Sequence, residues 1–390
     1  MKKIVVFILL IAVCSFINSC ASNYAKSNNK TSPFIIKKIV LNQKPYSVEV
    51  ADLNGDKIKD LVIANGEDSS VTVLLGTGNA NFKEAKGSPF PAGNMPNDIA
   101  IADFNKDGIP DLAFANHDRK YLTVLTGDGK GGFTPLKGSP FSVKVRPHTH
   151  GIAVGDFNGD GNLDLVTDSW GDNQLAILFG NNQHGFNATA KYISVGKHPY
   201  QRIRVADLNK DGKPDIVTTN LDGNNSTILL GDGKGNFHEP AGSPFPCGDA
   251  PFGIAIGDIN GDRNPDLTII NSPSITASNE GHDGLTILLG DGKGKFAIMP
   301  GSPFATGRSP SRLATGDLNG DGIPDIVVTN YNNSNISVFM MGTNAVKSSY
   351  TFSVGSKPDG VAIADLNGDG KADVVVSNSG ENYISVLIGR

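Results

Sequence analysis

The chain has 390 residues and a formal net charge of −5, with 38% hydrophobic and 19% charged residues. The sequence contains no basic stripe interleaved with aromatic residues, so it gives no support to nucleic-acid binding. Aromatic residues make up only 7% of the chain whereas glycine numbers 47, a composition typical of short strands joined by tight turns and not of helices.

The chain begins with a segment that resembles the export signal of bacterial lipoproteins. Two lysines precede an apolar run over residues 4–13, which is too short to span a bilayer and is built like the hydrophobic region of a signal peptide. The run leads into INSC, which resembles a lipobox, so residues 1–19 are expected to be removed and Cys20 to be acylated. The alternative is a plain signal peptide with a chance cysteine. Because Ala21 is not Asp, the resemblance implies export to an outer membrane or cell surface if the source is Gram-negative.

Residues 20–33 are rich in Asn, Ser and Lys and are expected to form a flexible tether. Of the three cysteines, Cys14 lies in the signal and Cys20 is the expected acylation site, so Cys247 is left alone. A disulfide framework is therefore excluded. No later apolar run is long enough to cross a bilayer, so the lipid anchor is the only expected contact with the membrane.

Residues 34–390 contain one unit repeated seven times, each copy marked by an acidic stretch. The stretches begin at Asp52, Asp103, Asp156, Asp207, Asp258, Asp317 and Asp365. Each unit also has an alternating segment before the stretch, and two short apolar runs and a Gly-rich turn after it. Four short strands in roughly 50 residues, repeated in this way, predict an all-β fold, a seven-bladed β-propeller with four-stranded blades. A linear β-solenoid is the structural alternative, but its repeat is far shorter.

The last unit stops after its third strand, at Arg390. Residues 34–42 precede the first acidic stretch and have no place in the first unit. We therefore predict that they pair as the outer strand of the last blade. Such pairing removes an open sheet edge and joins the two ends of the domain, as a disulfide would.

Each acidic stretch places oxygen-bearing side chains at positions 1, 3, 5 and 9, as in DFNGDGNLD. Ca²⁺ takes about six to eight oxygen ligands, which a sharply turning loop can supply from alternate residues. Three carboxylates so close together would repel one another unless a divalent cation neutralised them. The alternative is a series of Asx-rich turns without metal. We expect up to seven structural Ca²⁺ ions, with the following ligands: Asp52, Asn54, Asp56, Asp60, Asp103, Asn105, Asp107, Asp111, Asp156, Asn158, Asp160, Asp164, Asp207, Asn209, Asp211, Asp215, Asp258, Asn260, Asp262, Asp266, Asp317, Asn319, Asp321, Asp325, Asp365, Asn367, Asp369 and Asp373.

Position 6 of the acidic stretch is Gly in most copies, where the sharp turn is expected to need a positive φ. It is Lys57 in the first copy and Arg263 in the fifth. A side chain at positive φ is strained, and both residues bring a positive charge near the expected ion. We therefore predict weaker Ca²⁺ binding at these two loops.

The repeated D-x-N-x-D-x-x-x-D loops, with later turns such as LLGDGKGNF, resemble the FG-GAP/VCBS repeat family. Its best-known members are the integrin α-chain propellers, and the resemblance covers residues 34–390. It implies that the loop between the first and second strands of each blade binds a structural Ca²⁺ on one face of the disc. Segments such as GDGKGGF superficially suggest phosphate-binding loops, but no helical segment follows them, so we interpret them as hairpin turns.

Strand polarity places the acidic loops and the Gly-rich turns on one face. The loops that join fourth to first strands and second to third strands share the opposite face, on which the units differ most; we name it the variable face. Aromatic and polar residues there could hold a sugar or a peptide, although each alone is also explained as a solvated loop side chain. The candidate ligand-binding residues are Tyr46, Asp98, His117, His148, His150, Trp170, Tyr200, Arg202, Arg312, Tyr331 and Asp359.

Three functions are compatible with this sequence. The favoured one is a surface-anchored, calcium-stabilised lipoprotein that binds a glycan or protein partner without catalysis. The second is a carbohydrate-active enzyme similar to polysaccharide lyases, with its site in the central channel, although no local catalytic signature is present. The third is a passive subunit of a surface assembly. No nucleic-acid partner is expected.

Overall fold

The structure, a computed structural model, describes residues 33–144, 146, 149–181, 185–274 and 282–390. Pro33–Arg390 form one compact unit. The expected signal peptide, the acylation site Cys20, the tether up to residue 32 and the candidate His148 lie outside the described residues. In the described part, no helix has the length and apolar character needed to cross a membrane.

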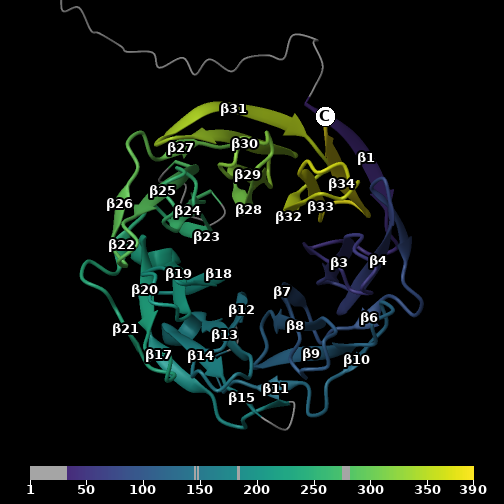
Figure 1. Ribbon diagram of the computed structural model, residues 1–390, viewed down its shortest axis with the longest axis horizontal. Helices are drawn as coiled ribbons and strands as arrows, with labels where there is room; N and C mark the ends of the chain where they lie inside the picture. The colour runs from purple at the N-terminus through teal and green to yellow at the C-terminus, as the bar shows by residue number, and fades with distance from the viewer. Residues whose placement is uncertain (1–32, 145, 147–148, 182–184, 275–281) are drawn as a thin grey trace, which may run out of the picture. The chain divides into compact units, whose positions relative to one another are not determined.

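The described residues form seven main sheets that stand as blades around a central channel (Figure 1). All pairings are antiparallel, and the chain moves outward through each blade before it enters the next. We number the blades in chain order. The innermost strands are the predicted alternating segments: β2 (Ser47–Ala51), β7 (Pro96–Ala102), β12 (Ile152–Gly155), β18 (Pro199–Ala206), β23 (Pro251–Gly257), β28 (Pro310–Gly316) and β32 (Pro358–Ala364).

The second strand of each blade is buried along its whole length, because neighbouring blades cover both of its faces. This explains why these strands are largely apolar runs in the sequence. They are β3 (Asp60–Asn65), β8 (Asp111–Asn116), β13 (Asp164–Ser169), β19 (Asp215–Asn220), β24 (Asp266–Asn271), β29 (Asp325–Asn330) and β33 (Asp373–Asn378). The third strands are β4 (Ser70–Gly78), β9 (Tyr121–Gly127), β14 (Gln174–Leu178), β20 (Asn225–Gly231), β25 (Gly284–Gly290), β30 (Asn335–Gly342) and β34 (Tyr383–Gly389).

The outer position differs between blades. In blades 1, 2, 4 and 5 it holds two short strands that both pair with the third strand: β5 (Asn81–Glu84) and β6 (Phe90–Pro91), β10 (Phe133–Pro135) and β11 (Phe141–Ser142), β21 (Phe237–His238) and β22 (Phe245–Pro246), β26 (Phe296–Ile298) and β27 (Phe304–Ala305). Blade 3 has β17 (Lys191–Ser194) and a small hairpin of β15 (Gly180–Asn181) and β16 (Gly185–Phe186). Blade 6 ends in β31 (Ala345–Ser353). Two short 3-10 turns, η1 (Trp170–Asp172) and η2 (Leu221–Gly223), follow the second strands of blades 3 and 4.

The N-terminal strand β1 (Phe34–Val40) completes blade 7. It pairs antiparallel with β34, with Phe34 opposite Gly389 and Val40 opposite Tyr383. The predicted ring closure is therefore confirmed, and so is the all-β propeller of seven four-stranded blades. The paired strand ends at Val40 and not at residue 42.

The core consists of apolar layers between successive blades. In blades 2, 4 and 5 the Phe that follows the Gly-rich turn contacts a Phe of the preceding blade: Phe133 with Phe90, Phe237 with Phe157, and Phe296 with Phe245, at centroid distances of 5.6 to 5.7 Å. Each Gly-rich segment joins a third strand to an outer strand, so these segments are hairpin turns, as the sequence predicted. The turns sit beside acidic loops, since Gly235 donates its N–H to the carbonyl oxygen of Phe157 at 2.8 Å.

Candidate functional site

The acidic loops are folded around their own carboxylates. In the first loop, Asp52 accepts the N–H groups of Gly55 at 2.8 Å and Lys57 at 2.9 Å. The Oδ1 atom of Asn54 accepts the N–H of Asp56 at 3.0 Å. These bonds are those of Asx turns, and they collect the oxygens of positions 1, 3 and 5 within one exposed turn.

Two positions of each acidic loop adopt the left-handed conformation. Position 6 has a positive φ in every copy, including Lys57 and Arg263, both at 68°. The predicted positive φ at this position is therefore confirmed, although Lys57 and Arg263 adopt it without glycine. Position 4 is also left-handed, and there Lys106 and Lys210 have φ values of 61° and 60°. The sequence analysis did not single out this second position.

The Asp at position 9 clamps the acidic loop to the third strand of its blade or, in blade 3, to Gly180 just beyond that strand. In the third loop, Asp164 accepts the N–H of Phe157 and, with its other oxygen, the N–H of Gly180, both at 2.8 Å. The same two bonds form in all seven blades. The side chains involved are fully buried: Asp60, Asp111, Asp164, Asp215, Asp266, Asp325 and Asp373.

The position 9 carboxylates, which we call the clamp carboxylates, lie in an environment that disfavours their ionised form. Burial raises the pKa of Asp164 and of Asp266 to about 7, and that of Asp111 and of Asp215 to about 6. The two N–H donors oppose this rise, whereas the carboxylates at positions 5 and 1 of the same loop add to it. The three carboxylates of a loop are thus close enough to repel one another.

The side-chain donors of the acidic loops are all oxygens. Within the described ranges, no group of three or more His, Cys, Asp or Glu side chains is arranged to hold a metal ion. The donors nevertheless suit a hard cation, because all are oxygens and a carboxylate oxygen that accepts one N–H keeps a second lone pair. Positions 1, 3 and 5 supply the more accessible donors of each loop, except that Asn260 at position 3 of the fifth loop is buried. The position 9 carboxylate already serves two N–H groups and would have to share its oxygens with an ion.

Four of the candidate ligand residues meet in the central channel, near the start of the innermost strands. Asp98 of blade 2 accepts hydrogen bonds from Arg202 of blade 4 and, at 3.5 Å, from Arg312 of blade 6. The Nε of Arg312 donates to Asp359 of blade 7 at 3.2 Å, and the hydroxyl of Ser311 donates to the same carboxylate at 2.6 Å. The two ion pairs of Asp98 join non-adjacent blades across the channel, whereas that of Asp359 joins neighbouring blades. We name Asp98, Arg202, Arg312 and Asp359 the channel cluster.

The channel cluster is buried and its charges balance. Its four side chains belong to residues that are at most 5% exposed. Burial, assisted by the like charge of Arg312, lowers the pKa of Arg202 to about 9. Burial also lowers the pKa of Arg312, but the carboxylates of Asp359 and Asp98 outweigh it and leave that pKa raised. The two guanidinium groups are therefore committed to two carboxylates inside the channel.

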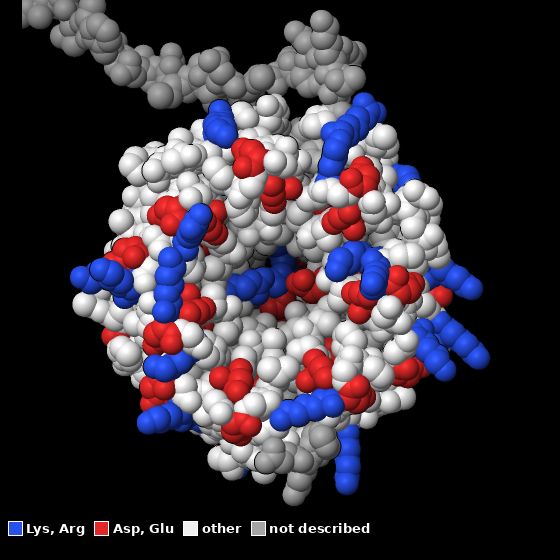
Figure 2. Space-filling model, in the orientation of Figure 1, with Lys and Arg blue, Asp and Glu red and all other residues white. Residues whose placement is uncertain are grey.

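Two further charged residues lie in the channel and were missed by the sequence analysis. Burial raises the pKa of Glu49. The positive charges of Arg202 and Arg204 from blade 4 and of Arg312 from blade 6 oppose this rise. Figure 2 shows basic and acidic atoms inside the central opening. Neither Glu49 nor Arg204 forms an ion pair with another described residue. The sequence could have revealed both residues, because each lies three positions before the acidic stretch of its blade. In the five remaining blades that position is alanine: Ala100, Ala153, Ala255, Ala314 and Ala362.

A second group of candidates forms a row of rings along the variable face. The ring of His150 lies 4.5 Å from that of His117 and 4.1 Å from that of Tyr200, measured between centroids. Tyr200 in turn lies 5.2 Å from Phe252, which the sequence analysis did not select. The Nδ1 of the buried His150 is 3.2 Å from a carboxylate oxygen of Asp168. We name His117, His150, Tyr200 and Phe252 the aromatic row; it joins blades 2 to 5.

The remaining candidates are separate from the aromatic row. Trp170 stacks on His198 with a centroid distance of 4.0 Å and an interplanar angle of 18°. The Nδ1 of His198 lies 2.7 Å from a carboxylate oxygen of Asp222. Tyr331 lies 5.7 Å from the ammonium of Lys357. The last candidate, Tyr46, is placed 5.5 Å from the guanidinium of Arg312, beside the channel cluster.

A model of the FG-GAP-like repeat matches residues 52–114, 103–167, 207–269, 275–328 and 317–376, which together make up more than half of the chain. The chain belongs to the FG-GAP-like repeat family. This FG-GAP-like repeat protein is 24% identical over 187 residues to cartilage acidic protein 1 of Xenopus tropicalis. That match covers 45% of the chain but only 29% of the relative, so the two proteins share part of their length.

Solved structures with a similar fold come from proteins of different roles. They include BBS1N in complex with ARL6DN (TM-score 0.56, 14% identity, 93% of this chain and 98% of that chain). A lectin of Agrocybe aegerita that recognises non-reducing terminal N-acetylglucosamine has a TM-score of 0.54 and 19% identity, over 87% of this chain and 86% of that chain. A protein of Lactobacillus plantarum has a TM-score of 0.58 and 15% identity, over 80% and 86%. At these identities the likeness shows the fold alone.

Proposed function

We propose that this FG-GAP-like repeat protein is a non-enzymatic binding or adhesion module, whose variable face holds a glycan or a protein partner. The observation that carries the proposal is a set of partly exposed rings there: His117 and Tyr200 of the aromatic row, and the stacked pair Trp170 and His198. His150 and Phe252 are buried and support the two partly exposed rings of the row from below. Aromatic side chains on loops of a rigid scaffold suit the apolar faces of sugars and the side chains of peptides.

The comparisons support both ligand classes without choosing between them. The Agrocybe aegerita lectin recognises a sugar, N-acetylglucosamine, on a fold of this kind. BBS1N forms a complex with a protein, ARL6DN. Since fold alone does not decide function, the ligand of this chain has to be found by experiment.

Up to seven Ca²⁺ ions are part of the proposal, as structural ions in the acidic loops. The side chains at positions 1, 3 and 5 of each loop would hold them, with the position 9 clamp sharing its oxygens. Burial is the main cause of the raised pKa of Asp164, and the nearby carboxylates of Asp160 and Asp156 add to it. This added repulsion is the electrostatic cost that an ion would relieve. Removal of Ca²⁺ with EDTA should therefore lower the melting temperature. An unchanged melting temperature would refute this part of the proposal.

Surface anchoring through an acylated Cys20 completes the proposal. Residues 20–33 would then separate the propeller from the outer membrane or cell surface. The support is the lipobox-like sequence at the N-terminus. Globomycin, which blocks removal of lipoprotein signals, should cause the uncleaved precursor to accumulate, and a Cys20→Ala variant should show no lipid attachment by mass spectrometry.

Binding and catalysis are separated by one screen of the purified protein against glycans and acidic polysaccharides, with and without EDTA. We expect saturable binding without turnover, and weaker binding by a Trp170→Ala variant. A Tyr350→Ala variant is the matched control, because Tyr350 is an exposed aromatic residue on the outer strand β31. Release of unsaturated sugar products would overturn the proposal in favour of a lyase. Absence of both binding and turnover across the glycan screen would favour a protein partner, which includes the neighbours of a passive subunit in a surface assembly.

A further inference from the structure

The outer edge of blade 7 differs from the edges of most other blades. In blades 1, 2, 4 and 5 the outer position is divided between two strands of at most four residues. Short and interrupted edges protect a sheet against pairing with another chain. The edge of blade 7 is instead the continuous strand β1, which has seven residues.

The outward main-chain groups of β1 can be assigned from its pairing. Next to its two ends, Pro33 and Leu41 form backbone hydrogen bonds with Arg390 and Asn382, which flank β34. Hydrogen-bonded residues alternate along an antiparallel ladder, so the odd-numbered residues of β1 bond to β34. The even-numbered residues of β1 consequently direct their N–H and C=O groups outward. In the described part of the chain, β34 is the only strand that pairs with β1.

The exposed edge carries large aliphatic side chains. Ile35 and Ile36 are 45% and 44% exposed, and Val40 is 80% exposed. A continuous edge that carries exposed aliphatic side chains is the surface on which an extended segment adds as a further strand. The main-chain groups would supply affinity in such a complex, and alternate side chains would supply specificity.

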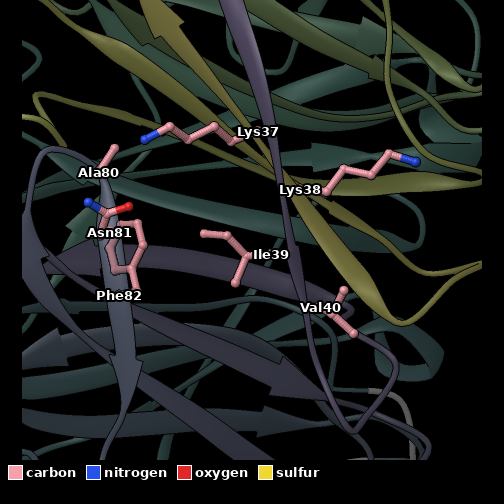
Figure 3. Close-up of a pocket in the computed structure, with 7 residues that line it drawn as sticks. All are labelled: Lys37, Lys38, Ile39, Val40, Ala80, Asn81 and Phe82. Atoms are coloured by element: carbon pink, nitrogen blue, oxygen red, sulfur yellow. The ribbon is translucent and has the colours of Figure 1, made fainter.

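A pocket of about 470 Å³ lies beside this edge. It is lined by residues of β1 and by Ala80, Asn81 and Phe82 at the outer hairpin of blade 1. Figure 3 shows Lys37 and Ile39 pointing toward this hairpin. Since side chains of a strand alternate between its two faces, every second residue of an added strand would face the pocket.

The charge of the edge selects the partner. Lys37 and Lys38 lie at its centre, and neither forms an ion pair with a described residue. Symmetric pairing of two copies through β1 would bring these lysines face to face, which is unfavourable. The chain's own residues 20–33 include two lysines and no acidic residue, so they do not match the edge either.

We propose that β1 is a docking edge for an extended, acidic segment of a partner protein. The segment adds to blade 7 as an outer strand, hydrogen-bonds to the outward groups of Ile36, Lys38 and Val40, and places carboxylates near Lys37 and Lys38. One of its apolar side chains enters the pocket beside blade 1. This surface is on the rim of the propeller and does not depend on ligand binding at the variable face.

The test uses the purified full chain and a blocked, fluorescent peptide with two central glutamates flanked by alternating valine and threonine. Anisotropy should show saturable one-to-one binding that weakens as salt is added. The double variant Lys37→Glu/Lys38→Glu should weaken binding by about tenfold or more, because two attractions become repulsions. The matched control is Lys293→Glu/Lys295→Glu, which makes the same charge change at exposed residues of a Gly-rich turn and should bind normally.

Further probes separate strand addition from simple charge attraction. A peptide methylated at alternate backbone nitrogens keeps its charges but loses the N–H donors of one edge, and it should not bind. A Val40→Glu variant, altered at a site that is 80% exposed, tests the edge without disturbing the core. Equal binding of the methylated peptide, or no loss in either edge variant, overturns the proposal. Binding to anionic phospholipid vesicles without peptide binding would assign the edge to a membrane, and dimers abolished by Val40→Glu would assign it to a second copy.

Discussion

Replacement of Asp98 by Asn should strongly destabilise the propeller. The carboxylate of Asp98 is fully buried and serves both Arg202 and Arg312, and its second oxygen accepts the N–H of Ile152 at 3.2 Å. The channel cluster contains two guanidinium groups and two carboxylates, so the variant leaves one buried positive charge in excess. Removal of one partner from a buried ion pair costs about 3–5 kcal/mol. Asn fills the same space, so the loss is electrostatic.

The loss of stability caused by Asp98→Asn can be measured by thermal unfolding. For a unit of this size, about 4 kcal/mol corresponds to a fall in melting temperature of about 5 °C. Arg119→Gln is a suitable control, because Arg119 is exposed and its guanidinium donates to Asn94 at 2.8 Å, so loss of the charge should cost less than about 1 kcal/mol. A fall of less than 1 °C for Asp98→Asn would refute the view that these charges hold the ring together.

Three other substitutions or probes test separate parts of the structure. Glu49→Gln should raise the melting temperature near pH 8, because burial raises the pKa of Glu49 and the folded protein is destabilised when this carboxyl is ionised. The gain should vanish below about pH 4, where the carboxyl is neutral in both the folded and the unfolded protein. Asp164→Asn should cost about 1–3 kcal/mol on urea unfolding, since one of two buried N–H groups loses its acceptor. Exposed Asp160→Asn, measured without Ca²⁺, should cost less. Burial raises the pKa of the Cys247 thiol, so it should resist alkylation until the chain unfolds, and rapid labelling in the native protein would contradict its position.

The architecture could be predicted because its signals are local and repeated. Seven acidic stretches with alternating segments before them specify seven short strand groups, and the strand missing from the last unit accounts for the pairing of β1. The left-handed residue at position 6 followed from one glycine position, and Lys57 and Arg263 adopt the same conformation without glycine. Features that depend on one turn or one strand were accessible to sequence reasoning.

The contacts across the ring could not be predicted in the same way. Arg312 and Asp98 are 214 positions apart, and no periodicity indicates that their side chains meet. The sequence did not indicate that the position 9 Asp accepts N–H groups from its own blade, because the same carboxylate oxygens could equally coordinate Ca²⁺. The aromatic row was found only in part, because Phe252 looked like an ordinary strand residue.

The central claim is that the variable face is the binding surface and that the opposite face is scaffold. Hydrogen–deuterium exchange with and without a ligand found by the glycan and protein screens tests it most directly. The account predicts slower exchange on ligand binding in the loops around His117, Trp170 and His198, with no change in the acidic loops. Protection confined to the acidic loops or the Gly-rich turns would contradict it.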